Sequence, residues 1–193
     1  RNVGAGMPYA TISAGVAALP ASLTGHSCVV IRDGGTYNEQ VTVRNFTNNG
    51  SSITIRADPA SGLRPIISPP ANSTGAFHLA NDSVNVTGVN VSIAQNISFG
   101  IFASSAYVNL TDVLVSTPVG SAAYKLYGVR LSSWSTISYS TVSSPYVGIW
   151  LDESTMSVVS YSTVNAFGGA GGYALYLTGA ASNTVTHSYI QDL

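Results

Sequence analysis

Two short sequence phrases alternate along this chain from about Gly75 onward, and this repetition constrains the fold more than any other feature. The first is small–apolar–x–apolar, as in Gly148-Ile149-Trp150-Leu151, and it begins at residues 76, 100, 128, 148 and 174. The second has two apolar residues separated by four mostly polar ones, and it spans residues 86–91, 110–115, 137–142, 159–164 and 185–190. Each phrase recurs at intervals of roughly 20 to 28 residues. This period, with two short β-like segments per unit, predicts a β-solenoid.

The spacing of apolar residues separates a β-solenoid from other repeat folds. From Ile66 onward no window holds apolar residues at i, i+3, i+4 and i+7, which argues against helical repeats. A β-propeller needs four strands per blade and a longer period. Each segment alternates, so one face is expected to enter the core, and equivalent residues of successive coils should form ladders about 4.8 Å apart. We therefore predict an all-β, single-stranded right-handed parallel β-helix.

The N-terminal section follows a different pattern. Between Tyr9 and Leu23, apolar residues recur at helical spacing until Pro20, which predicts an amphipathic helix of about three turns. Residues 1–27 are therefore interpreted as a cap over the first coil, and residues 28–193 as the coils, with early strands at 28–31, 41–43 and 53–55. No matching cap is evident at the C-terminus, so we expect a truncated chain or one that continues.

Composition argues against several kinds of partner. Charged residues are only 8% of the chain, against about 25% in typical globular proteins, and the formal net charge is −1. That charge gives no electrostatic basis for binding nucleic acid. No apolar run approaches the roughly 18 to 20 residues of a membrane span. Cys28 is the single cysteine, and its apolar surroundings predict a small core residue without a disulfide partner.

Nearly the whole chain resembles the pectin lyase-like superfamily of right-handed parallel β-helices. The repeats from Gly75 to Leu193 resemble the short parallel β-helix repeat shared across that superfamily. Residues 9–12, 29–31 and 35–41 are similar to the start of pectin methylesterases and related cell-surface solenoids. The resemblance implies the fold but no single activity, because the superfamily includes lyases, hydrolases, esterases, epimerases, phage tailspikes and adhesins.

The chemistry that the resemblance implies is not matched by the acidic residues. Pectin methylesterase-like catalysis needs two Asp and an Arg on one sheet, but Asp112 and Asp152 fall in different phrases and are expected on different sheets. A pectate lyase-like calcium site needs several carboxylates, and only Asp152-Glu153 offers an adjacent pair. The paired carboxylates of a polygalacturonase-like hydrolase cannot be assembled either. We expect no metal or other cofactor, and calcium has no support beyond that pair.

A row of large side chains is expected on the outer face of the solenoid. It consists of the x residue of each first phrase: His78, Phe102, Arg130, Trp150 and Tyr176. Sugar rings stack on aromatic faces, and Arg130 can stack on Trp150 as a cation–π pair. We interpret the row as a candidate ligand-binding surface. Two other interpretations remain open: cover by a loop or a neighbouring chain, and stacking for stability alone.

Charged residues near this row are the weak candidates for catalysis. They are Lys125, Arg130, Asp152 and Glu153. Arg130 and Asp152 belong to neighbouring coils, so the simplest interpretation is an ion pair between them. A catalytic acid–base set is the alternative.

Two further ladders are expected to be structural. Tyr139 and Tyr161 occupy equivalent positions near a corner of successive coils and should stack on each other. Ser140, Ser162 and Ser188 follow them in register and should form an inward ladder of hydroxyl groups bonded along the axis. Because these serines have no paired base, nucleophilic catalysis is not expected from them.

Three functions remain open on the sequence alone. The first is an extracellular or cell-surface solenoid that acts as a structural, adhesive or carbohydrate-binding module, with a polysaccharide or surface glycan as partner. The second is a polysaccharide lyase, a glycoside hydrolase or a pectinesterase-like enzyme acting on acidic polysaccharide along the aromatic row. The third is a self-assembling fibre or tailspike-like component, joined through the uncapped C-terminal coil.

Overall fold

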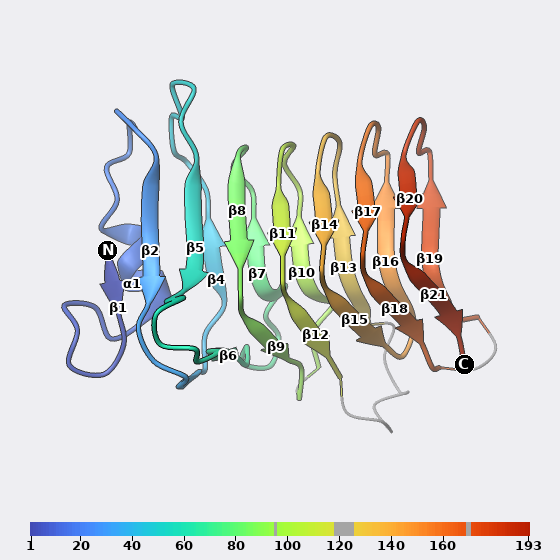
Figure 1. Cartoon of the computed structure of the whole chain (residues 1–193), viewed down its shortest axis with the longest axis horizontal. Helices are drawn as coiled ribbons and strands as arrows, with labels where there is room; N and C mark the ends of the chain where they lie inside the picture. The colour runs from blue at the N-terminus through green and yellow to red at the C-terminus, as the bar shows by residue number, and fades with distance from the viewer. Residues whose placement is uncertain (95, 118–125, 169–170) are drawn as a thin grey trace.

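The computed structural model describes residues 1–94, 96–117, 126–168 and 171–193, and in these ranges the chain winds into a parallel β-solenoid (Figure 1). Its strands form three sheets in which all the pairings are parallel, as predicted. The eight-stranded sheet contains β1 (Asn2–Val3), β2 (Ser27–Ile31), β5 (Ile53–Ala57), β8 (Val84–Thr87), β11 (Asn109–Thr111), β14 (Thr136–Ser138), β17 (Val158–Ser160) and β20 (Thr184–Thr186).

The other two sheets carry one strand of each coil in the same axial order. The six-stranded sheet contains β4 (Val41–Val43), β7 (Gly75–Leu79), β10 (Phe99–Ala103), β13 (Tyr127–Leu131), β16 (Val147–Asp152) and β19 (Tyr173–Thr178). The seven-stranded sheet contains β3 (Thr36–Tyr37), β6 (Ile66–Ile67), β9 (Asn90–Ser92), β12 (Leu114–Ser116), β15 (Thr141–Ser144), β18 (Thr163–Ala166) and β21 (Tyr189–Asp192). Successive coils therefore stand side by side along one axis, from the blue end to the red end of Figure 1.

The two repeated phrases correspond to defined parts of each coil. The first phrase forms the strands of the six-stranded sheet, where Phe102, Arg130, Trp150 and Tyr176 follow one another in register. The second phrase spans a strand of the eight-stranded sheet, a two-residue corner and a strand of the seven-stranded sheet. The alignment of phrases made from the sequence is thus the alignment of coils in the structure.

The core is a set of aliphatic ladders inside the solenoid. In β10 and β16, for example, Ile101, Ile149 and Leu151 are fully buried while the residues between them face outward. Burying one such side chain contributes about 1.5–3 kcal/mol. Repeated in every coil, this contribution holds the three sheets together.

The small residue of the first phrase is required by close packing between two sheets. A Cβ atom on Gly128 would lie 2.5 Å from Cγ1 of Val142 and 2.6 Å from the carbonyl oxygen of Gly148. Gly148 is equally confined, because its Cβ would lie 2.5 Å from Cγ1 of Val164. The six-stranded and seven-stranded sheets can approach this closely only because the side chain is missing.

The corners between sheets are turned by single residues with left-handed backbone angles. One corner of the later coils is turned by Tyr107, Trp134 and Met156, with φ of 57–58°. The corner inside the second phrase is turned by Tyr139 and Tyr161, with φ of 51° and 48°. The two tyrosine rings stack 5.1 Å apart at an angle of 5°, which confirms the predicted stack.

The serine ladder is also confirmed. The hydroxyl of Ser140 accepts from the N–H of Val113, that of Ser162 accepts from Ser140, and that of Ser188 accepts from Ser162, all at 3.2 Å. Ser140 and Ser162 are buried. The hydroxyls satisfy backbone donors inside the corner, which would otherwise be unpaired.

The predicted N-terminal helix forms, but it is shorter than three turns. Helix α1 spans Ile12–Ala17 and buries Ile12 and Val16 against the first coils. Thr11 caps it by accepting from the N–H of Ala14, and the Glu39 carboxylate accepts from two more backbone N–H groups. The helix cannot begin earlier because Tyr9 forms a parallel bridge with Val3. Within the described residues, no helix has the length and apolarity needed to cross a membrane.

The prediction for Cys28 is wrong. In β2 the residues that face the core are Val29 and Ile31, so alternation places Cys28 on the outer side, half-buried and paired with Thr54 of β5. Residues 28–31 are all apolar, so the sequence did not show which of them face the core and which face outward. The predicted early strands at 28–31, 41–43 and 53–55 are nevertheless present as β2, β4 and β5.

Candidate functional site

The predicted row of large side chains lies on the outer face of the six-stranded sheet. His78 on β7, Phe102 on β10, Arg130 on β13, Trp150 on β16 and Tyr176 on β19 are register partners in five successive coils. The first four are half-buried, and Tyr176 is exposed. Because the flanking residues of each strand enter the core, the sheet presents these five groups side by side.

These groups touch one another along the solenoid axis. The rings of His78 and Phe102 have centroids 5.1 Å apart. The Arg130 guanidinium carbon lies 4.9 Å from the centroid of Phe102 and 5.5 Å from that of Trp150, so the cation is held between two rings. Trp150 in turn lies 6.3 Å from Tyr176. The row is therefore one continuous contact surface.

A second column of rings, which sequence reasoning missed, runs beside the first. Phe99, Tyr127 and Tyr173 are equivalent residues of β10, β13 and β19. Phe99 stacks on Phe102 at 4.7 Å and on Tyr127 at 5.2 Å. We call the two columns together the aromatic platform: His78, Phe99, Phe102, Tyr127, Arg130, Trp150, Tyr173 and Tyr176.

The second column was hidden by an irregularity in the strands. In β10 both Gly100 and Ile101 are buried, so the outward positions Phe99 and Phe102 are three residues apart instead of two. Strict alternation therefore predicts the wrong phase for Phe99. The usable signal was the residue just before the small residue of each phrase, which is aromatic at 99, 127 and 173.

The centre of the platform carries a paired charge. Nε and Nη2 of Arg130 donate to Oδ2 of Asp152 at 3.1 Å and 2.6 Å. The predicted ion pair is therefore present, but it is less exposed than the surface pair expected from the sequence, since the side chains of Arg130 and Asp152 are only 20% and 18% exposed. Beside it, Nε1 of Trp150 donates to Oγ1 of Thr178 at 3.0 Å, which fixes the indole.

The remaining charged candidates do not join this pair. Glu153 is exposed at the turn after β16, and its N–H donates to the carbonyl of Thr178. Lys125 lies outside the described residues. Asp112 stands at a corner after β11 and pairs with Arg64 at 2.7 Å, so Asp112 and Asp152 are on different sheets, as expected.

Two titratable rings of the platform, His78 and Tyr127, are held in their neutral forms. Burial, followed by the positive charge of Arg44, lowers the pKa of His78 below its usual 6.5. Burial, followed by Tyr146 and Tyr176, raises the pKa of Tyr127 above 10.0. At neutral pH the imidazole is therefore uncharged and the phenol is protonated.

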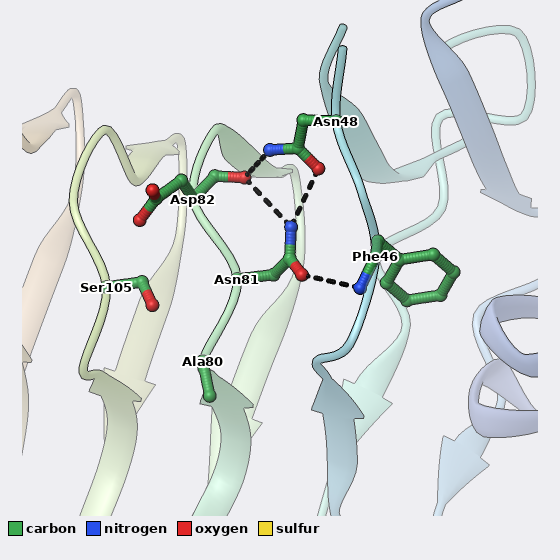
Figure 2. Close-up of a pocket in the computed structure, with 6 residues that line it drawn as sticks. All are labelled: Phe46, Asn48, Ala80, Asn81, Asp82 and Ser105. Carbon is green, nitrogen blue, oxygen red and sulfur yellow. Dashed lines mark hydrogen bonds between the residues drawn. The ribbon is translucent and has the colours of Figure 1, made fainter. Parts of the chain in front are cut away.

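Three surface hollows of about 270–320 Å³ lie away from the platform. One of about 270 Å³ is lined by Phe46, Asn48, Ala80, Asn81, Asp82 and Ser105. Figure 2 shows how the buried Asn81 amide joins two coils here: it accepts from the N–H of Phe46 at 2.8 Å and donates to Asn48 at 2.8 Å. Its polar atoms are already paired, so they are not available to orient a ligand.

The part of the chain that the structure describes offers few side chains for metal binding or acid–base catalysis. No cluster of three or more His, Cys, Asp or Glu side chains occurs there that could hold a metal ion. On the platform, Asp152 is the one carboxylate among the described residues that contacts a platform side chain, and it is paired with Arg130. What the platform does offer is flat apolar rings with polar edges.

Comparison with known proteins supports the fold and leaves the function open. No family model matches the chain, and no curated protein matches it. Solved structures do match, among them a point mutant of pectin methylesterase in complex with a hexasaccharide, and pectin methylesterase in complex with another hexasaccharide. Each is 12% identical and superimposes with a TM-score of 0.67 over 96% of this chain. The chain spans 65% of the length of those proteins.

The class of this molecule follows from these observations together. Three parallel sheets wound about one axis, and the match over nearly the whole chain, define a parallel β-helix that shares its fold with pectin methylesterase. At 12% identity the likeness to pectin methylesterase shows the fold alone. The aromatic platform must therefore be interpreted from its own side chains.

Proposed function

We propose that this solenoid is a non-catalytic carbohydrate-binding module that holds an extended polysaccharide on the aromatic platform. The observation that carries the proposal is the platform itself, a continuous surface of half-exposed and exposed rings, with the Arg130 guanidinium among them, in contact across five coils. Sugars present apolar C–H faces that stack on such rings, and a flat row suits a chain better than a single sugar. The pectin methylesterases with the same fold were solved with hexasaccharides bound, which supports a polysaccharide as the class of ligand.

The charged groups favour binding over catalysis. Glycoside hydrolysis needs two carboxyl groups flanking the bond that is cleaved. Asp152 is instead bound to Arg130, and the neighbouring Glu153 is exposed at the turn and is not part of that ion pair. We place the module outside the cell or on its surface, where a low-charge, rigid solenoid is of use as a structural or adhesive element.

A retention assay on immobilised plant and bacterial polysaccharides tests this proposal. The wild-type chain is expected to be retained by at least one polysaccharide, and Trp150→Ala is expected to weaken that binding about tenfold or more. Trp134→Ala is the matched control, because Trp134 stands at a corner and stacks on Tyr107. Efficient release of reducing or unsaturated ends from the bound polymer would contradict a non-catalytic role.

A polysaccharide lyase or hydrolase is the second candidate, favoured by the position of the Arg130–Asp152 pair in the middle of the platform. In that case Arg130→Ala should abolish turnover of an acidic polysaccharide while the circular dichroism of the fold is unchanged. If neither the wild type nor the variant releases product from any polymer of the panel, this candidate is eliminated.

Self-association into a fibre or larger assembly is the third candidate. Leu177, Val185 and Ile190 occupy core positions of the last coil, yet they are 49%, 42% and 36% exposed. A second copy that covers them would bury this apolar surface. A mass in solution that rises with protein concentration supports this candidate, and a strict monomer at high concentration contradicts it.

A further inference from the structure

Three side chains of the aromatic platform, His78, Tyr127 and Arg130, are neutral or have their charge neutralised by a neighbour. His78 and Tyr127 are held in their uncharged forms by burial. Arg130 is charged, but Asp152 lies against it at 2.6 Å. A surface that recognises an acidic polymer normally offers guanidinium or ammonium groups whose N–H donors face the ligand. Where such a surface would present N–H donors, the platform presents aromatic rings.

The geometry around Arg130 explains why its charge is not available. Two of its N–H donors are committed to one oxygen of Asp152. The flat guanidinium lies between the rings of Phe102 and Trp150. With only 20% of the Arg130 side chain exposed, the guanidinium offers little surface to a ligand, and a ligand carboxylate that reached it would place a second negative charge beside Asp152.

Other charged groups lie at the margins. Arg44 follows β4 at the end of the platform nearest His78 and is exposed. Glu153 is exposed next to Asp152. Lys125 lies outside the described residues. Arg44 and Glu153 have opposite charges and lie in solvent, where salt screens them over about 8–10 Å.

We propose that Asp152 determines the charge class of the ligand: by neutralising Arg130, it makes the aromatic platform selective for uncharged polysaccharide chains over polyuronates. This inference rests on the proposed function, because it concerns the same surface. Stacking on the rings supplies the affinity, and the paired Asp152 carboxylate supplies the discrimination by repelling acidic sugars and withholding the guanidinium.

Matched pairs of oligosaccharides test the inference. The members of each pair share a backbone and differ in charge: β-1,4-mannohexaose and β-1,4-hexamannuronate, cellohexaose and its C6-oxidised form, and methyl-esterified and free hexagalacturonate. For the pair that binds, the wild type is expected to favour the uncharged member about tenfold or more by calorimetry. Asp152→Asn keeps the shape and an acceptor for Arg130 but removes the charge, so the preference should fall to within about threefold, with uronate binding now sensitive to salt.

Glu153→Gln is the matched control, because it removes a neighbouring carboxylate that is not paired with Arg130. It should leave the preference of the wild type in place. Arg130→Met gives an opposite test: Asp152 is then unpaired, and the preference against the uronate should increase. Circular dichroism and thermal unfolding confirm that each variant is folded before it is titrated.

The outcomes separate the two proposals. If the wild type binds the uronate as well as or better than the neutral partner, or if Asp152→Asn leaves the preference unchanged, the inference about charge is overturned while carbohydrate binding stands. The same holds if Glu153→Gln acts as strongly as Asp152→Asn. If no member of any pair binds, the proposed function fails and the inference fails with it.

Discussion

The eight-stranded and six-stranded sheets have the same parallel backbone pairing but carry different side chains on their outer faces. On the eight-stranded sheet, Asn85 donates to Thr54 at 3.1 Å, Asn109 donates to Asn85 at 2.9 Å, and Thr136 donates to Asn109 at 2.7 Å. Polar side chains there bond mainly to one another along the axis. On the six-stranded sheet, equivalent positions carry the rings of the aromatic platform, which contact one another and are half-exposed or exposed.

The difference shows which part of a coil determines fold and which part determines function. Inward residues such as Ile55 beneath the polar face and Ile101 beneath the platform are fully buried and chemically alike. The parallel pairing is the same in both sheets. Only the outward residues differ, so we expect substitutions inside the solenoid to alter stability and substitutions on the platform to alter binding.

The largest expected effect comes from the core that both faces share. Phe77 is fully buried on the inner side of β7, and Phe77→Ala should destabilise the chain by about 3–5 kcal/mol, because it removes apolar contacts and leaves a cavity. Urea unfolding followed by circular dichroism measures this loss. Thr42→Ala, at an outward position of the adjacent strand β4, is the control and should change stability by less than about 1 kcal/mol. Equal losses would mean that inward and outward positions are not distinct in energy.

The next effect distinguishes platform rings from corner rings. Tyr127 stacks on Phe99 and Trp150, and Tyr127→Ala should weaken glycan binding about tenfold, or about 1.4 kcal/mol. Tyr161 also stacks, between Tyr139 and His187, but at a corner outside the platform. Tyr161→Ala should therefore leave the affinity unchanged in the same calorimetric titration. A loss of affinity in Tyr161→Ala alone would assign the ligand to the corner.

A smaller effect tests the polar face. Asn109→Ala removes two hydrogen bonds of the ladder on the eight-stranded sheet and should cost about 1 kcal/mol or slightly more of unfolding free energy. Glycan affinity should not change, because the substitution lies on another sheet. A weaker affinity in the folded variant would show that the polar face also contributes to binding.

The smallest effect is a pH dependence on the platform. The pKa of His78 is lowered in the folded chain by burial and by Arg44, so the unfolded chain binds a proton more readily. Stability should therefore decrease as the pH falls through the unfolded value of about 6.5 and reach its full penalty below the folded pKa. Comparing unfolding free energies at pH 7.5 and pH 5 in the wild type and in His78→Phe isolates this contribution. An equal pH dependence in both proteins would assign it to other groups.

Particular residues show how far the sequence could predict this structure. The apolar spacing of the two phrases was enough to predict the coils and the register of Phe102, Arg130 and Trp150, because each coil repeats the same inward pattern. The phrases did not reveal Phe99 or Tyr127, since two consecutive buried residues interrupt the alternation there. Such irregularities depend on the close approach of another sheet, which no local pattern encodes.

The ends of the helix and the environment of Cys28 could not be predicted for a related reason. Helix α1 begins at Ile12 because Tyr9 is already paired with Val3, a contact between segments that only the folded chain brings together. Cys28 lies in a run of apolar residues, and no polar residue within it indicates which positions face outward. The pairing of Arg130 with Asp152 was predictable because both residues belong to strands of known order.

Tryptophan fluorescence tests the central claim most directly, because the chain has only two tryptophans and one of them lies on the platform. In Trp134→Phe, Trp150 is the sole reporter, and titration with the oligosaccharide retained in the binding assay should shift and saturate its emission. In Trp150→Phe, the remaining Trp134 should give no such change. Saturable binding by Trp134→Phe with no change in the emission of Trp150 would place the ligand away from the aromatic platform and contradict the account.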